Sequence, residues 1–308
     1  MTSEHALSSD GASLARSGRS DKDGARHAER RRSLDEEVFV AFGALDRELF
    51  GQVSADAAAW NRSGGARVAT LLGAILTHVA ARGLDAVHVL NMSGLNQGKP
   101  DPVLFDLAAR ELGPRRLSWT VVDHPQSQTF TDPTIRGWLD ARGIARIGED
   151  FRDPDLSVAE GCADVVLCTE ILEHLDYTVA MRLLRRCQRA LRPGGLLIIT
   201  TPNAVCIEHR IRFALGHWDF LHFMDDPDDV ERGLLGHIMY YDGARLTRVL
   251  RSLGFGPVRA STFNAGHGPG EYRNPLTRAA AIALRALSWL LPRSGQVLLV
   301  CAEKPAGP

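Results

Sequence analysis

The feature that most constrains the fold is a pair of short apolar runs separated by a stretch of helix length. The first run, Ala163–Thr169, reads ADVVLCT, and the second, Leu196–Thr201, reads LLIITT after a Pro-Gly-Gly break. Two strands joined through a helix run parallel, since a tight hairpin turn links only antiparallel strands. The chain therefore contains a βαβ unit. Ligands bind such sheets outside the carboxyl ends of the strands, which places the expected chemistry at 168–174 and 201–203.

The same stretch resembles the class I S-adenosylmethionine-dependent methyltransferases, and within them the branch that includes ubiquinone-pathway O-methyltransferases. The resemblance rests on DVVLCTEILEHL, which ends at Leu175, and on LRPGGLLIITTPN, which ends at Asn203, and it extends over about 86–263. It implies an α/β fold with a Rossmann-like, doubly wound, mostly parallel seven-stranded sheet, an antiparallel last strand and additional amino-terminal helices. It also implies S-adenosylmethionine as the cofactor.

The composition is that of a globular protein in a reducing compartment. Of 308 residues, 44% are hydrophobic and 24% are charged, which suits a full core and an ordinary surface. The formal net charge of −1 gives no overall attraction to nucleic acid or to an anionic membrane. Five cysteines without a Cys-x-x-Cys pair argue against a disulfide framework and against a structural zinc site. Because no secretory signal is found, a cytoplasmic location is expected.

The chain divides by composition into three parts. Residues 1–32 are rich in Ser, Gly, Ala and Arg and hold almost no large apolar residue, which predicts a disordered tail. Residues 33–82 contain two helical patterns, and the first opens with a capping box formed by Ser33 and Glu36. Two roles stay open for these helices: a lid over the substrate, and plain packing on the sheet. Residues 83–308 form the expected methyltransferase domain.

Two additions lie inside this domain. The long irregular connection at 204–243 is expected to border the substrate, because connections of this length in a compact domain are usually functional. The extra helix at 274–291 is too short to span a membrane and carries charge. Peripheral contact with a membrane, packing on the domain and contact with a second subunit, as in a homodimer, stay open for this helix.

The resemblance assigns cofactor contacts to the ends of four strands. Family members carry an acid and then a glycine-rich turn after the first strand; here Asn91 replaces the acid and Ser93 the first glycine, while Gly94 remains. A neutral Asn accepts a hydrogen bond but forms no ion pair with an ammonium group. Asp123, at the end of the next strand, is expected to bind the ribose hydroxyls. The other expected contacts are Asp150 and Phe151 beside the adenine and Cys168, Thr169 and Glu170 at the end of the central strand.

The candidate catalytic residues follow the central strand. Glu170, Glu173 and His174 stand at i, i+3 and i+4, which places them on one side of the expected helix. Carboxylates and imidazoles suit a divalent cation such as Mg²⁺, Mn²⁺ or Zn²⁺. Small-RNA 2′-O-methyltransferases bind metal through a similar motif and a later histidine, which by this resemblance is His237. Many relatives carry the Glu-His pair without metal, and His174 or His237 is then the expected general base.

The leading function is O-methylation of a small-molecule or glycan hydroxyl. A binding or scaffold domain without catalysis is the first alternative, because Asn91 and Ser93 weaken the cofactor loop. An RNA 2′-O-methyltransferase-like enzyme is the second, but nucleic acid is not the expected partner. The arginine stripe that would favour RNA is typical of a solvated helix face and comprises Arg182, Arg185, Arg186, Arg189 and Arg192. A nicotinamide oxidoreductase is disfavoured, since no Gly-x-Gly-x-x-Gly follows the first strand.

Overall fold

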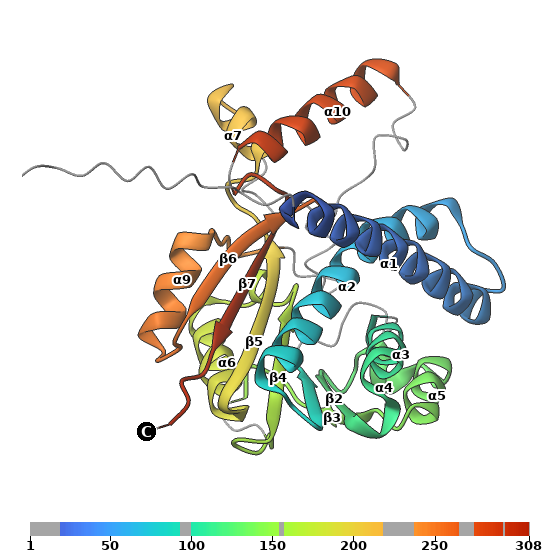
Figure 1. Ribbon diagram of the computed structural model, residues 1–308, viewed down its shortest axis with the longest axis vertical. Helices are drawn as coiled ribbons and strands as arrows, with labels where there is room; N and C mark the ends of the chain where they lie inside the picture. The colour runs from blue at the N-terminus through green and yellow to red at the C-terminus, as the bar shows by residue number, and fades with distance from the viewer. Residues whose placement is uncertain are drawn as a thin grey trace, which may run out of the picture.

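The computed structural model is a seven-stranded sheet with helices on both faces (Figure 1). The strand order is β3-β2-β1-β4-β5-β7-β6, which confirms the predicted doubly wound α/β fold. The structure describes residues 19–92, 100–153, 157–217, 237–264, 274–291 and 293–307, with the side chains of α1 described from residue 34 onward.

The strands are mostly parallel, as predicted. Their bounds are β1 Val87–Asn91, β2 Leu117–Asp123, β3 Ala145–Gly148, β4 Ala163–Thr169, β5 Leu191–Pro202, β6 Val258–Phe263 and β7 Val297–Glu303. Strands β1 to β5 pair in parallel. Strand β7 runs antiparallel to both of its neighbours, β5 and β6. The carboxyl ends of β1 to β5 therefore lie on one edge of the sheet, which is where a ligand is expected.

Helices cover both faces of the sheet. Their bounds are α1 Arg19–Phe50, α2 Ala55–Arg82, α3 Pro100–Leu112, α4 Gln128–Thr131, α5 Pro133–Ala141, α6 Tyr177–Ala190, α7 Ile207–Ala214, α9 Gly243–Ser252 and α10 Pro275–Leu290. One hydrophobic core packs α1, α2, α3 and α5 on the sheet. A second core packs α6 and α9 on the opposite face. All residues of β4 are buried, as expected for a parallel strand covered on both faces.

The amino-terminal helix begins earlier than predicted. Helix α1 starts at Arg19, so Ser33 lies inside the helix and the predicted capping box at that residue is wrong. The predicted disordered tail is also wrong for residues 19–32, and residues 1–18 lie outside the described part of the chain. Residues 25–32 are mostly Ala, Arg and Glu, which are strong helix formers, so their intrinsic propensity favours a longer helix.

Helix α2 is part of the core. Leu71, Leu72 and Ile75 are fully buried, in the same cluster as Val89 of β1 and Val165 of β4. By length and composition, one helical stretch of the described chain could cross a membrane: Gly64–Arg82, within α2. Half of this stretch is buried inside the fold, and its packing on the sheet accounts for its apolar character.

The Pro-Gly-Gly turn sets how β5 joins the sheet. Gly194 has a positive φ of 78°, a conformation that glycine adopts at little cost. A Cβ atom on Gly195 would lie 3.0 Å from the carbonyl oxygen of Asp164, so a side chain at that position would clash with β4. The glycines thus let β5 approach β4 closely. The pairing of the two strands extends as far as Thr169 and Thr200, at the edge of the sheet where a ligand is expected.

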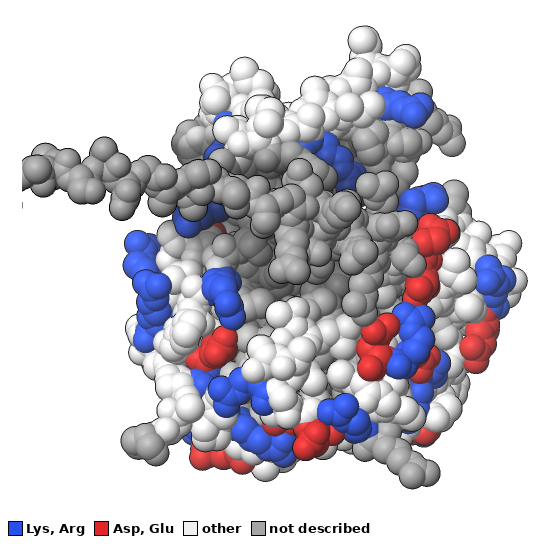
Figure 2. Space-filling model, in the orientation of Figure 1, with Lys and Arg blue, Asp and Glu red and all other residues white. Residues whose placement is uncertain are grey.

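Helices α7 and α10 lie together at one end of the molecule, beyond the helices that cover the sheet (Figure 1). Helix α10 agrees with the predicted extra helix, and Asn274 Oδ1 caps it by accepting from the backbone N–H of Leu276. Leu276 and Leu290 are each 79% exposed. In Figure 2 the described surface at this end is white and blue, whereas red and blue are interspersed over the sheet domain.

Candidate active site

The chain turns sharply at the carboxyl end of β4. Glu170 has a left-handed backbone conformation, with φ of 50°, and its amide N–H donates to Thr200 O at 2.8 Å. This conformation is uncommon for a residue other than glycine. A single 3-10 turn, Leu172–His174, follows, and helix α6 starts only at Tyr177. The prediction that one helix carries Glu170, Glu173 and His174 on the same side is therefore wrong.

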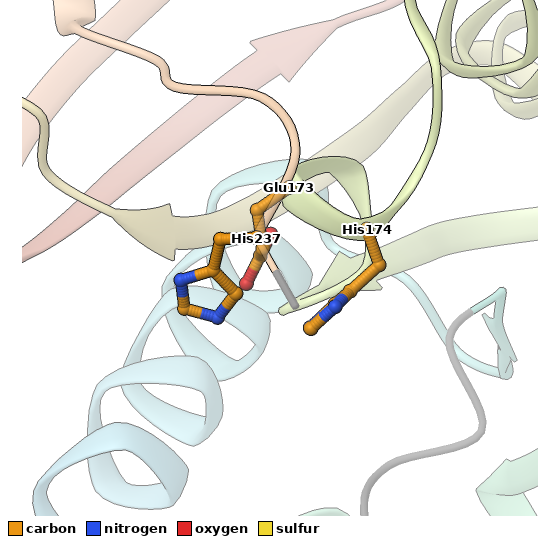
Figure 3. Close-up of side chains that lie close together, drawn as sticks. All are labelled: Glu173, His174 and His237. Carbon is orange, nitrogen blue, oxygen red and sulfur yellow. The ribbon is translucent and has the colours of Figure 1, made fainter. Parts of the chain in front are cut away.

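Three of the four predicted metal ligands nevertheless come together (Figure 3). One oxygen of Glu173 and one ring nitrogen each of His174 and His237 lie within 4.8 Å of one another. The two imidazole rings meet edge to face, with centroids 4.9 Å apart. Glu173 and His174 reach the cluster from the turn after β4, and His237 from the segment before α9. Glu170 does not join the cluster, because its carboxylate pairs with Arg67 of α2.

Backbone hydrogen bonds hold His237 at this turn. The next two amide N–H groups, of Ile238 and Met239, donate to the carbonyl oxygen of Glu173 at 2.8 and 3.0 Å. Further along, Tyr241 is buried and forms a β-bridge with Asn203, which follows β5. The segment with His237 is therefore fixed to the residues that follow both β4 and β5.

Burial controls the charge of the cluster. Glu173 is 1% exposed, and the Thr201 hydroxyl donates to its Oε2 at 2.9 Å. Its Oε1 is buried without a hydrogen-bond partner among the described residues. Burial, and to a lesser extent the negative charge of Glu170, raise the pKa of Glu173 to about 8. Burial also lowers the pKa of His237, so its ring stays unprotonated near neutral pH and is able to accept a proton.

Two of the predicted cofactor residues, Asp123 and Asp150, lie at the ends of neighbouring strands. Asp123 ends β2 and pairs in register with Gly148 at the end of β3. Its carboxylate accepts from the His124 backbone N–H at 2.7 Å and from the Thr129 hydroxyl at 2.8 Å. Burial raises the pKa of Asp123.

Asp150 completes this part of the edge. Its Oδ2 lies 3.7 Å from His124 Nε2, so the ends of β2 and β3 are in contact through their side chains. Hydrogen bonds from Arg152 lower the pKa of Asp150 to about 2, which keeps the carboxylate ionised. The two acids are thus positioned side by side on one edge.

The turn beside Asp150 is anchored by a residue that sequence analysis placed on a solvated face. Arg186 of α6 is buried and donates to the carbonyl oxygens of Asp153 at 2.6 Å and Phe151 at 3.5 Å. The expectation for the arginine stripe is therefore wrong at this position, although Arg185 and Arg189 are exposed. The available signal was helical spacing, because Arg186 shares a face with buried residues three before and four after it.

A second residue that sequence analysis missed lies beside Asn91. Asn91 Nδ2 and Trp119 Nε1 each donate to Asp101 Oδ1 at 2.8 Å. Asp101 belongs to the first turn of α3 and is 2% exposed. Burial raises its pKa to about 6. The sequence contains no signal for this contact, since Asp101 lies ten residues after Asn91 and the fold brings the two side chains together.

The remaining predicted residues have different environments. Cys168 and Thr169 are buried within β4, and the Cys168 thiol contacts Cys187 of α6, inside the second core. Ser93 and Gly94 lie outside the described residues. His209, a histidine of the neighbouring helix α7, contacts the carbonyl oxygen of Ala204 and is not part of the cluster.

Comparison with protein families gives a match to the methyltransferase domain over residues 81–260. The match covers more than half of the chain. The chain belongs to the methyltransferase family. Its domain is a class I, S-adenosylmethionine-dependent methyltransferase domain, and the matched part runs from the end of α2 into β6. A comparison with curated protein sequences gives no match.

Solved methyltransferase structures are similar in fold. A SAM-dependent methyltransferase from Archaeoglobus fulgidus has 19% identity and a TM-score of 0.45, over 76% of this chain and 94% of the other. An O-methyltransferase family protein from Burkholderia thailandensis has 16% identity and a TM-score of 0.46, over 91% and 71%. The CurJ carbon methyltransferase has 14% identity and a TM-score of 0.49, over 93% and 71%.

The described residues of this methyltransferase fit S-adenosylmethionine. The carboxylate of Asp123 lies at a strand end, where it suits two ribose hydroxyls. Asp150 is ionised and Phe151 follows it, which suits an exocyclic amine and an adjoining ring face. Asp101 is a buried carboxylate beside the end of β1, and this suits the positive charge of the methionine part of the cofactor.

Proposed function

We propose that this methyltransferase transfers a methyl group from S-adenosylmethionine to a hydroxyl group of a small molecule or glycan. The observation that carries the proposal is the group formed by Glu173, His174 and His237, whose ligand atoms lie within 4.8 Å of one another. The group follows the carboxyl end of β4, between the cofactor edge and the segment that leads to α9. A methyltransferase for a hydroxyl needs a proton acceptor at this place.

The histidines supply the proton acceptor. S-adenosylmethionine provides an electrophilic methyl group on a sulfonium centre. In the transfer a carbon–oxygen bond forms as the carbon–sulfur bond breaks and S-adenosylhomocysteine leaves, and the unprotonated ring of His237 would take the hydroxyl proton. His174 packs edge-on against that ring. Such a base contributes about 10²–10⁴-fold to the rate, and correct positioning of the hydroxyl contributes further.

Glu173 positions the acceptor. Its Oε2 is engaged by Thr201, whereas its Oε1 is buried without a partner among the described residues. A buried polar oxygen without a partner is destabilising, so a ligand that supplies a polar hydrogen-bonding group at this place is favoured. Near neutral pH the carboxyl group is largely protonated and can donate a hydrogen bond to the acceptor oxygen.

A divalent cation is the second arrangement that the same residues support. One carboxylate and two imidazoles form a ligand set suited to Zn²⁺ or Mn²⁺, and less well to Mg²⁺, which prefers oxygen ligands. A bound cation would ionise Glu173, because a nearby positive charge lowers the pKa of a carboxyl group. It would then hold the acceptor oxygen and make its hydroxyl more acidic.

Methyl-transfer assays with labelled cofactor test the proposal. Phenols, alcohols, glycans, amines, thiols and RNA oligonucleotides are offered as acceptors, and the methylated atom is identified by mass spectrometry and NMR. O-methyl products from small molecules or glycans support the proposal. Products on nitrogen, carbon or RNA alone contradict it, and cofactor binding without any transfer favours a binding or scaffold domain.

Dialysis against a chelator separates the cation from the histidine base. Activity that is lost and returns with one added ion assigns the cation, and unchanged activity assigns the histidine base.

A further inference from the structure

A buried carboxylate without a positive partner lies beneath the end of β1. Both donors to Asp101, Asn91 Nδ2 and Trp119 Nε1, reach the same oxygen, Oδ1. No donor to Oδ2 and no ion pair of Asp101 occurs among the described residues. The charged group that acts on it is Asp123 of β2, whose negative charge makes ionisation of Asp101 still less favourable. A buried carboxylate in this situation favours a ligand that brings a positive charge.

The position of Asp101 places its negative charge at the edge of the sheet where the cofactor is expected. Asn91 is the last residue of β1, and in the sheet β1 lies between β2 and β4. Asp101 enters from the first turn of α3, where the amino-terminal end of the helix also favours a negative charge. The Asp101 carboxylate and the Asn91 amide are therefore hydrogen-bonded to each other at the end of β1. The acid comes from α3 and the amide from β1.

We propose that Asp101 provides the negative charge for the ammonium group of S-adenosylmethionine. Asn91 connects the acid to the end of β1: its amide nitrogen donates to Asp101, and its side-chain oxygen is directed away from that bond. Asp101 thereby brings to the end of β1 the negative charge that the neutral Asn91 does not carry. Asp101 is a positioning residue for the methionine part of the cofactor and takes no part in the methyl transfer itself.

Binding calorimetry with two ligands tests this role without any acceptor. S-adenosylmethionine carries the ammonium group, whereas 5′-methylthioadenosine shares its nucleoside and lacks the whole amino-acid part. Asp101→Asn is expected to weaken binding of S-adenosylmethionine by about 10- to 100-fold, the range for a hydrogen bond to a charged group. The affinity for 5′-methylthioadenosine is expected to stay within about twofold of the unmodified protein, given that no charge is lost from its contacts.

An exchange variant provides the matched control. Asn91→Asp combined with Asp101→Asn keeps one acid and one amide in the pair but moves the acid onto the strand. We expect this double variant to recover most of the affinity for S-adenosylmethionine. Equal losses for both ligands in Asp101→Asn, or no recovery in the exchange variant, would overturn the proposal and leave Asp101 as a purely structural residue.

The unmodified protein gives an independent readout if Asp101→Asn fails to fold. Burial raises the pKa of Asp101 to about 6, so the acid ionises as the pH rises from about 5 to 7. The affinity for S-adenosylmethionine should increase over this range more steeply than that for 5′-methylthioadenosine. Asp123 is expected to bind the ribose that both ligands share, so its direct effect on binding is the same for both, and its effect through Asp101 is part of the titration under test. Identical pH dependence for the two ligands would contradict the proposal, and the result does not depend on which acceptor is methylated.

Discussion

Arg67, in α2, forms an ion pair with Glu170, the residue that follows β4: Arg67 Nη2 lies 3.3 Å from Glu170 Oε2. Both side chains are about three-quarters buried. The pair joins the amino-terminal helices to the turn that carries Glu173 and His174. It also keeps Glu170 out of the cluster, and the positive charge of Arg67 opposes part of the rise in the pKa of Glu173.

Loss of this ion pair should affect both stability and the cluster. Arg67→Ala is expected to lower the free energy of unfolding by about 1–3 kcal/mol, because Glu170 is left partly buried without its partner. Chemical denaturation measures the loss. Glu170→Gln and the double variant complete a mutant cycle: if the two single losses simply add up in the double variant, the residues are not coupled and the interpretation is wrong.

Substitution of either histidine of the cluster is expected to reduce catalysis far more than substitution of a histidine outside it. His237→Ala and His174→Ala should each reduce kcat by about 10²–10⁴-fold if the ring acts as base or ligand, with little change in the affinity for S-adenosylmethionine. His209→Ala is the control, since its half-buried ring contacts a backbone carbonyl outside the cluster. Equal effects of all three substitutions on kcat would argue against the assignment.

The raised pKa of Glu173 predicts that the free energy of unfolding decreases as the pH rises. Its pKa in the folded protein is about 8, above the usual glutamate value of 4.5, so between these values the folded state holds a proton that the unfolded state releases. Stability from this group is therefore present at low pH and is lost as the pH rises from about 4.5 through 8. Glu173→Gln removes the titration, and thermal unfolding should show a larger gain for the variant at pH 8 than at pH 5. A gain that does not change with pH would contradict the prediction.

Asp123 is expected to bind the ribose, which both test ligands contain. Asp123→Ala should weaken S-adenosylmethionine and 5′-methylthioadenosine alike, by about tenfold or more, because two charge-assisted hydrogen bonds are lost. This result differs from the one expected for Asp101→Asn. Calorimetry with both ligands therefore separates the ribose contact from the ammonium contact, and a loss confined to S-adenosylmethionine would be evidence against Asp123 as the ribose ligand.

Helix α10 is expected to make peripheral contact with anionic lipid. Residues 274–293 contain no acid and hold Arg278, Arg285 and Arg293, while Leu276 and Leu290 project into solvent. Sedimentation with vesicles of anionic and of neutral lipid measures the contact, and replacement of both leucines by Gln should abolish it. Dimerisation through α10 in the absence of lipid, detected by light scattering and lost in the same variant, would assign the helix to a subunit interface instead.

The centre of the sheet could be predicted from the sequence largely because its central strands are buried on both faces. Strand β4 has the predicted bounds and β2 ends at Asp123 as predicted, since continuous apolar runs with a polar end allow little choice of register. The start of α1 at Arg19 was missed because residues 19–32 show helix propensity in the sequence but no apolar periodicity. The expected helix after β4 was wrong because Glu170 adopts a left-handed conformation that the pattern of apolar residues does not encode.

The candidate site was predicted in part. His237 was assigned by resemblance, and its approach to Glu173 depends on backbone hydrogen bonds that residue types do not specify. Arg186 and Asp101 were missed for a related reason: a charged side chain in a sequence is usually exposed, and its burial depends on carbonyl and amide partners that only the fold brings near.

The place of β7 between β5 and β6 has a consequence for biosynthesis. During translation β6 emerges before β7, its neighbour among the described strands, and one edge of β5 also stays open until residues 297–303 have left the ribosome. Unpaired strand edges promote association with other chains, so the nascent protein is exposed to aggregation until β7 is made. The seven residues of β7 thus close two open edges at once, and deletion of residues 297–303 would leave both edges unpaired.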